Sequence, residues 1–151
     1  MRRASLEEKD LVVDILTQSF ESNQSVNYIV SQDKKRLERI RVLMDYSFDV
    51  CSLFGEVFIS DDKKACALIV YPDKKKTNIK SALLDLKLIT QCIGIKNVKK
   101  TLDREALIKK TQPKEPMTYL WFIGVSLTDQ NRGIGSKLLR GVIELLSTAI
   151  S

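Results

Sequence analysis

The chain of 151 residues is 44% hydrophobic and 29% charged, a balance that suits one soluble domain with a real core. It contains no histidine, which excludes Ser-His-Asp or Cys-His catalysis and the H-E-x-x-H zinc motif within this stretch. Its longest apolar runs are well short of the ~20 residues that span a bilayer, and its N-terminus turns acidic too early for a secretory signal, so we expect a cytoplasmic protein.

Two helices are predicted in the first third of the chain. Ser5 and Glu8 have the spacing of a capping box, which marks a helix start. The apolar residues that follow share one helical face: Leu11, Val12, Ile15, Leu16 and Phe20. The polar stretch 22–31 is predicted to be a loop. A second helix is predicted over about 34–54, with Gly55 as its C-cap and with an inner stripe of Leu37, Ile40, Met44 and Phe48.

A hairpin and two further helices are predicted next. The apolar runs 56–60 and 65–71 are separated by four polar residues, which is typical of two antiparallel strands. A helix is predicted over 79–95, where one face carries Leu83, Leu86, Ile89 and Ile93. A short charged helix is predicted over 98–110.

The last third begins with a strand over 119–125, whose nearly continuous apolar run predicts a central strand buried on both faces, with Trp121 in the core. A seven-residue segment follows: Gln130-Asn131-Arg132-Gly133-Ile134-Gly135-Ser136. It precedes an amphipathic helix over 137–150, whose apolar face comprises Leu138, Leu139, Val142, Ile143, Leu146 and Ile150.

The segment 130–136 predicts an anion-binding site. The first turn of a helix has unpaired N–H groups and the positive end of the helix dipole. Gly133 and Gly135 let a ligand approach the backbone, and Arg132 adds a positive charge. Together these features predict an anionic cofactor that carries a pyrophosphate. The spacing fits neither a Walker A loop nor a Rossmann loop. The alternative is a short turn in which the glycines only relieve strain.

Residues 120–125, followed by Gln130-x-x-Gly133-x-Gly135 and residues 137–139, resemble the acetyl-CoA signature of the GNAT acetyltransferase superfamily over about residues 119–143. The resemblance implies that loop amides hold the CoA pyrophosphate and that the edge of the preceding strand pairs with pantetheine. It implies Val125 N–H as the donor to the oxyanion. The predicted cofactor-binding residues are Ile123, Gly124, Val125, Gln130, Asn131, Arg132, Gly133, Ile134, Gly135 and Ser136.

The resemblance also implies a fold of mixed α/β (α+β) class, with a central antiparallel sheet flanked by helices. We expect residues 1–151 to form a single domain with a helical insertion at about 79–111, which either covers the substrate side or only packs on the sheet. The family continues after the helix of 137–150 with further strands, so we expect its C-terminal portion to be missing from this chain. Leu127 stands where the family often has proline. No catalytic residue is assigned.

The net charge of +6 gathers in short lysine-rich runs, such as 34–36 and 74–76. We interpret these runs as solvated surfaces, with steering of anionic CoA and a nucleic-acid footprint as alternatives. Three cysteines without C-x-x-C spacing indicate a reducing compartment, and we predict Cys66 and Cys92 to be small core residues. No metal is expected.

The leading hypothesis is an acetyl-CoA-dependent N-acetyltransferase that moves the acetyl group to an amine by direct attack. A non-catalytic acyl-CoA-binding module is the second hypothesis, and a basic nucleic-acid-binding domain is the third. We expect a small-molecule or peptide amine as substrate, and neither nucleic acid nor a membrane as partner. A homodimer is left open.

Overall fold

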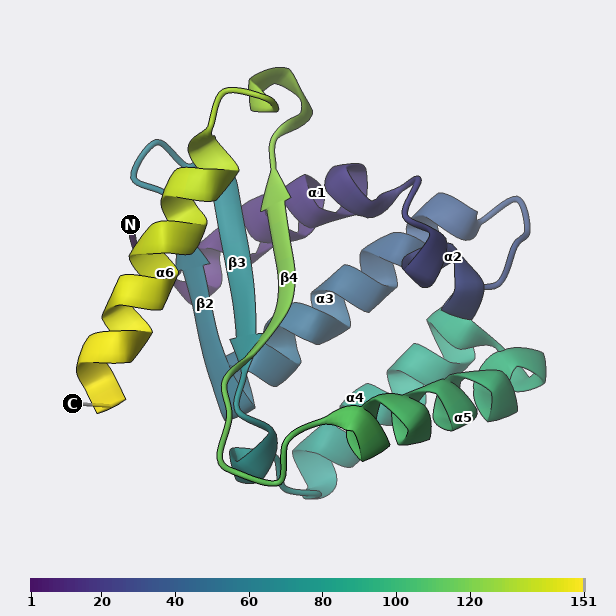
Figure 1. Ribbon diagram of the computed structural model, residues 1–151. Coiled ribbons are helices and arrows are strands. Elements are labelled where there is room, and N and C mark those ends of the chain that lie inside the picture. The colour runs from purple at the N-terminus through teal and green to yellow at the C-terminus, as the bar shows by residue number, and fades with distance from the viewer. Residues whose placement is uncertain (151) are drawn as a thin grey trace.

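The computed structural model describes residues 1–150, with side chains described through residue 149. Within this range, four strands form one sheet in the order β1-β2-β3-β4, and all neighbours are antiparallel. The strands are β1 (Arg2–Arg3), β2 (Gly55–Ile59), β3 (Ala65–Val70) and β4 (Tyr119–Val125). Helices cover both faces of the sheet (Figure 1). The expected central antiparallel sheet flanked by helices is therefore confirmed.

The main core lies on the face covered by α1 (Lys9–Phe20) and α3 (Arg36–Phe54). The predicted helical faces are largely correct, because seven of the expected inward residues lie in this core or pack against it: Val12, Ile15, Leu16, Phe20, Ile40, Met44 and Phe48. Leu11 and Leu37 were expected on the same faces and are exposed instead. The opposite face is covered by α6 (Ile134–Ile150), which packs on β3 and β4 mainly through Leu138 and Val142.

The stretch 22–31 is not the predicted loop, because it contains the helix α2 (Gln24–Ile29). Asn23 caps this helix, since its side-chain oxygen accepts a hydrogen bond from Val26 N–H at 3.1 Å. Val26 is the residue of the helix that is buried in the main core. A helix of six residues with one buried side chain leaves too short a pattern to recognise in sequence.

Gly55 stands at the C-cap position of α3, as predicted, but it does not adopt the left-handed conformation of a glycine C-cap. Its φ of −163° is extended, and it forms the first residue of β2 directly after α3. A Cβ at this position would lie 1.9 Å from the carbonyl oxygen of Ile69 on the neighbouring strand. Glycine is required here because two backbones approach closely, and not because the helix ends in a left-handed turn.

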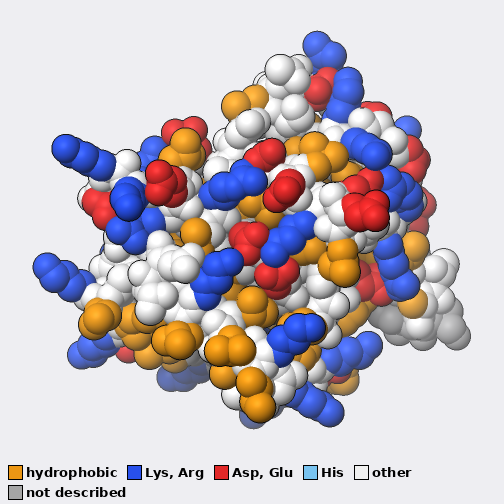
Figure 2. Space-filling view, turned by 180° about the vertical axis from the view of Figure 1, so that it is seen from behind, with side chains coloured by type: hydrophobic (Ala, Val, Ile, Leu, Met, Phe, Trp, Pro, Cys, Tyr) orange, Lys and Arg blue, Asp and Glu red, His pale blue; other side chains and the backbone are white. Residues whose placement is uncertain are grey.

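Residues 79–111 are helical, as predicted, but the buried face differs. The chain forms α4 (Ile79–Leu88), a π-helical turn (Ile89–Ile93) and α5 (Ile95–Thr111). Leu83 and Leu86 are 62% and 57% exposed, whereas Leu84 and Leu88 pack against the core. Figure 2 shows hydrophobic side chains gathered along the lower part of the molecule, where α4 and α5 lie. The π-helical turn shifts the helical phase, so the stripe predicted at a 3.6-residue period is not continuous.

Strand β4 lies at the edge of the described sheet, so the prediction of a central position is wrong. Both of its faces are nevertheless covered, by α1 on one side and by α6 on the other, and its side chains pack in both cores. Phe122 and Gly124 are its buried residues. Leu68 pairs with Phe122 and Ile69 pairs with Leu120, which leaves Trp121 as the extra residue of a β-bulge. Trp121 and Phe122 consequently both pack in the main core, as expected for Trp121.

Three one-turn 3₁₀ helices complete the description: Leu6–Glu8, Pro72–Lys74 and Leu127–Asp129. The first follows Ser5, whose backbone N–H donates to Glu8 Oε2 at 3.0 Å, as the predicted capping box requires. The last connects β4 to the segment 130–136.

All three cysteines are buried, which confirms the prediction for Cys66 and Cys92. Burial raises the pKa of the Cys51, Cys66 and Cys92 thiols to about 12. Each thiol is therefore protonated at neutral pH and fills the core as a small apolar group.

Candidate functional site

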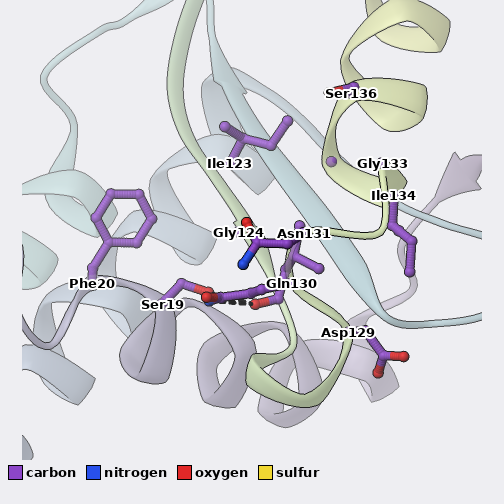
Figure 3. A pocket seen from close by; sticks show the side chains of 12 residues that line it. Ser19, Phe20, Ile123, Gly124, Asp129, Gln130, Asn131, Gly133, Ile134 and Ser136 are labelled. Carbon is purple, nitrogen blue, oxygen red and sulfur yellow. Dashed lines mark hydrogen bonds between the residues drawn. The ribbon is translucent and has the colours of Figure 1, made fainter.

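A pocket of about 380 Å³ opens where β4 ends and α6 begins (Figure 3). We call it the first pocket. It is lined by nine of the ten predicted cofactor-binding residues: Ile123, Gly124, Val125, Gln130, Asn131, Gly133, Ile134, Gly135 and Ser136. Arg132 does not line it. The fold therefore gathers these residues around one concave space, and their role as cofactor ligands stays a prediction.

The loop before α6 contains two residues in left-handed conformation. Asn131 has φ of 62° and Gly133 has φ of 76°. A Cβ at Gly133 would meet no other atom within 4 Å, so this position faces open space. A Cβ at Gly135 would lie 3.0 Å from Val125 Cγ2, so this glycine lets the first turn of α6 pack closely on β4. The two glycines have different tasks: Gly133 exposes backbone, and Gly135 positions the helix.

The first turn of α6 presents unpaired donors to the pocket. The carbonyl of Gly133 accepts a hydrogen bond from Lys137 N–H at 2.9 Å, which closes the first turn. Among the described residues, the N–H groups of Ile134, Gly135 and Ser136 have no acceptor. The positive end of the helix dipole lies at the same place. An anion in this pocket would find donors and a favourable potential together.

The open edge of β4 lines the same pocket as the start of α6. Ser126 N–H donates to Lys64 O at 2.7 Å, so the main-chain groups of Ser126 point toward the chain of β3. In an antiparallel pair, the main-chain groups of successive residues point alternately toward the neighbouring strand and away from it. The main-chain groups of Ile123 and Val125 consequently face away from β3. The carbonyl of Val125 confirms this direction, because it accepts hydrogen bonds from Ser19 Oγ at 2.9 Å and from Gln130 Nε2 at 3.4 Å.

Ser19 and Phe20, at the end of α1, also line the first pocket and were not predicted as site residues. Ser19 ties α1 to β4 through its hydrogen bond to Val125. Phe20 packs edge-to-face on Phe122, with ring centroids 5.1 Å apart. Ser19 and Val125 are 106 positions apart in sequence, so no local pattern could have joined them.

Asp129 fixes the base of the loop. It is 7% exposed and accepts hydrogen bonds from Lys64 Nζ at 2.8 Å, Thr128 Oγ1 at 3.0 Å and Arg132 Nη1 at 3.5 Å. The bond from Lys64 is the main cause that lowers the pKa of the Asp129 carboxyl, and the bond from Thr128 adds to it. The guanidinium of Arg132 thus pairs with Asp129 and does not line the first pocket. Through Lys64, Asp129 also links the loop to the turn between β2 and β3.

Asp129 is the one ionisable side chain among the residues that line the first pocket, and it is already paired. Hence this pocket offers donors for an anion but no free general base. In the part of the chain that the structure describes, no three His, Cys, Asp or Glu side chains form a group that could hold a metal. No described helix combines the length and apolarity that crossing a bilayer requires.

Comparison with known proteins identifies a similar fold. No family model matches the chain, and no curated protein matches it in sequence. A similar solved structure is a crystal structure from Corynebacterium glutamicum, described as histone acetyltransferase HPA2 and related acetyltransferase. The likeness covers 95% of this chain and 68% of that chain, with a TM-score of 0.68 and 18% identity. At this identity the likeness shows a common fold, and the GNAT-like fold expected from the sequence is confirmed.

Proposed function

We propose that this protein binds acetyl-CoA in the first pocket and transfers the acetyl group to an amine. The observation that carries the proposal is the combination of three unpaired N–H groups at the start of α6 with the open edge of β4. Those two features are the ones that the resemblance to the GNAT superfamily assigns to the pyrophosphate and to pantetheine. The similar fold of a protein described as an acetyltransferase supports acetyl transfer as the class of reaction.

The diphosphate would lie against the N–H groups of residues 134–136, where Gly133 leaves the space free. Each charge-assisted hydrogen bond to it contributes roughly 1.5–3 kcal/mol. Pantetheine would extend along β4, where the N–H groups of Ile123 and Val125 face outward. The carbonyl of Val125 already accepts two hydrogen bonds, so pairing at this residue would use its N–H.

The reaction would be direct aminolysis of the thioester. The amine nitrogen attacks the carbonyl carbon, a C–N bond forms and the C–S bond breaks. The nitrogen loses one proton to a base, and the CoA thiolate takes up one proton. Val125 N–H is our candidate donor to the oxyanion of the tetrahedral intermediate. Neither proton carrier is assigned to a residue.

A non-catalytic acyl-CoA-binding module is the second candidate function. One observation favours it: no unpaired ionisable side chain lines the first pocket. It would bind acetyl-CoA and acetylate no amine in a panel of acceptors, whereas an enzyme would release free CoA with at least one of them. The nucleic-acid alternative has less support, because Lys and Arg side chains are interspersed with acidic ones over the face in Figure 2.

Acetyl-CoA binding can be tested by thermal unfolding with a matched pair of variants. At a ligand concentration of about 100 times Kd, the wild-type protein should gain roughly 2.7 kcal/mol and its Tm should rise. Gly133→Val should abolish this rise, because a branched side chain would occupy the space of the anion. Gly94→Val is the control: Gly94 also has a positive φ, of 73°, but does not line the first pocket.

The control should lower the Tm of the free protein through backbone strain and keep the rise with acetyl-CoA. An unchanged rise in Gly133→Val would contradict the assignment of the loop. A rise lost equally in both variants would show that strain alone removes binding, which also contradicts it.

A further inference from the structure

A second pocket, of about 420 Å³, lies at the opposite end of β4 from the first pocket. Its apolar side includes Val50 from α3, Val70 from β3, and Tyr119 and Trp121 from β4. Its polar side comes from the segment after β3 and from α4 and α5. This size and this combination of an apolar wall with a few polar groups are typical of sites for small molecules.

The polar side of the second pocket carries charges of both signs. Asp85 on α4 and Glu105 on α5 provide two carboxylates, and Lys75, Lys76 and Lys109 provide three ammonium groups. None of these five side chains belongs to an ion pair among the described residues, although thirteen such pairs are found elsewhere. All five side chains are exposed, so the pocket presents charges of both signs that form no ion pair with one another.

The side chain of Tyr46 holds Asp85 in place. The buried Tyr46 hydroxyl donates to Asp85 Oδ1 at 2.7 Å, and the Tyr46 ring packs edge-to-face on Trp121 with centroids 6.2 Å apart. Burial first, and then Asp85 and Glu105, raise the pKa of Tyr46 far above its usual range, so its hydroxyl keeps its proton. The second carboxylate oxygen of Asp85 accepts no hydrogen bond from the described residues and is left for a ligand.

A row of aromatic rings joins the two pockets. Trp121 of the second pocket stacks on Phe122 with centroids 5.4 Å apart, and Phe122 packs on Phe20 of the first pocket. The bulge at Trp121 makes this row, because it turns two successive side chains to the same side of β4. A molecule in the second pocket would thus lie next to the strand that we propose for pantetheine.

We infer that the second pocket binds a small zwitterion of the amino-acid type, with an apolar body on Trp121 and Tyr119. Its ammonium group would pair with Asp85 and Glu105, and its carboxylate with the lysines. A ligand with a single charge would pair with only one of the two sets and would gain fewer charge-assisted hydrogen bonds. Under the proposed function, this molecule would be the acetyl acceptor. That role rests on the proposed function, whereas the binding itself does not.

Trp121 provides a direct readout, since it is the sole tryptophan of the chain and lines the second pocket. The probes are L-phenylalanine, L-leucine and L-methionine, titrated without acetyl-CoA while tryptophan emission is followed. At least one should give a saturable change. The single-charge analogues phenethylamine and 3-phenylpropionate should bind about tenfold more weakly than L-phenylalanine, as expected when one charged contact is lost.

Lys109→Gln and Lys110→Gln form a matched pair for this titration. Both lysines are exposed on α5, but Lys109 lines the second pocket and Lys110 does not. Lys109→Gln should weaken binding of the zwitterion severalfold, and Lys110→Gln should leave it unchanged. Asp85→Asn should also weaken it, by about tenfold. The absence of a saturable change with all three amino acids, or equal affinity for zwitterion and single-charge analogues, would overturn the inference.

The zwitterion site and the proposed function can be tested separately. Gly133→Val alters the first pocket only, so it should retain the response to amino acids while it loses the Tm rise with acetyl-CoA. An amino-acid response without any acetyl-CoA binding in the wild type would refute the proposed function and leave the second site intact. Acetyl-CoA binding without an amino-acid response would refute only the zwitterion site.

Discussion

The first and second pockets lie on the same strand but use different parts of the chain. The first pocket presents backbone N–H groups, three glycines and the edge of β4, and its one ionisable side chain is already paired. The second pocket presents side chains from separate segments, with an aromatic wall and unpaired charges. Backbone donors suit a ligand part that is always the same, such as a diphosphate. Side chains suit a ligand part that must be distinguished from its analogues.

The strongest disruption of the first pocket is expected from Gly124→Val. A Cβ at Gly124 would lie 3.0 Å from both Leu16 Cδ2 and Ser19 Oγ, so the two further methyl groups of valine would push the end of α1 away from β4. Such overpacking costs about 1–3 kcal/mol. Urea unfolding should show this loss, and the Tm rise with acetyl-CoA should disappear. The response of the second pocket to amino acids should persist, and its loss would show that the two pockets are not independent.

Tyr46→Phe should affect the second pocket alone. It removes the hydroxyl that holds Asp85 and costs about 1 kcal/mol in the free energy of unfolding. Amino-acid binding followed by Trp121 emission should weaken, while the Tm rise with acetyl-CoA should remain. Tyr28→Phe is the control, because Tyr28 is exposed and its ring keeps the contacts with Lys100 and Arg104. If both variants bind amino acids equally well, Tyr46 does not position Asp85.

Ser19→Ala is the matching change in the first pocket, with a smaller expected effect. The carbonyl of Val125 loses the bond from Ser19 but keeps the one from Gln130, so the cost should be about 0.5 kcal/mol. Acetyl-CoA affinity, measured by calorimetric titration, should change less than severalfold. Loss of a full factor of ten would show that Ser19 does more than tie α1 to β4.

Asp129→Asn should have the smallest effect at neutral pH, because asparagine keeps an oxygen for Lys64, whose side chain is 45% exposed. The effect should depend on pH. The folded protein lowers the pKa of Asp129, so its carboxylate stabilises the fold above the ordinary Asp pKa of about 3.9, and this contribution is lost as the pH falls through the folded pKa. The difference in urea midpoint between wild type and variant should therefore shrink below about pH 4. A difference that stays constant in acid would contradict the role of the Lys64–Asp129 pair.

Much of the fold could be predicted because its signals are local. The hairpin of β2 and β3 and the helix α3 each follow from a continuous run of residues. The errors arise where tertiary structure decides. The π-helical turn at residues 89–93 changes which leucines face inward, and the apolar run of β4 was interpreted as central although it lies at the edge of the described sheet.

The two pockets differ in the same respect. The loop of the first pocket was found because its residues are contiguous and follow a recognisable spacing. Ser19 and Asp129 were missed as parts of it, because their partners lie 106 and 65 positions away. The second pocket itself was not predicted, although the helices of residues 79–111, which help to line it, were expected either to cover the substrate side or to pack on the sheet. Its residues come from α3, α4, α5, two strands and the segment after β3, and each of them taken singly is an ordinary core or surface residue.

The burial of the three cysteines has a practical consequence for enzymology. Thiol reagents attack the thiolate, and the raised pKa values keep Cys51, Cys66 and Cys92 protonated and enclosed in the native protein. The CoA released by an acetyl transfer would carry a freely accessible thiol. A chromogenic disulfide reagent could therefore count turnovers of the proposed reaction continuously with little background from the protein, and a later burst of colour would mark its denaturation.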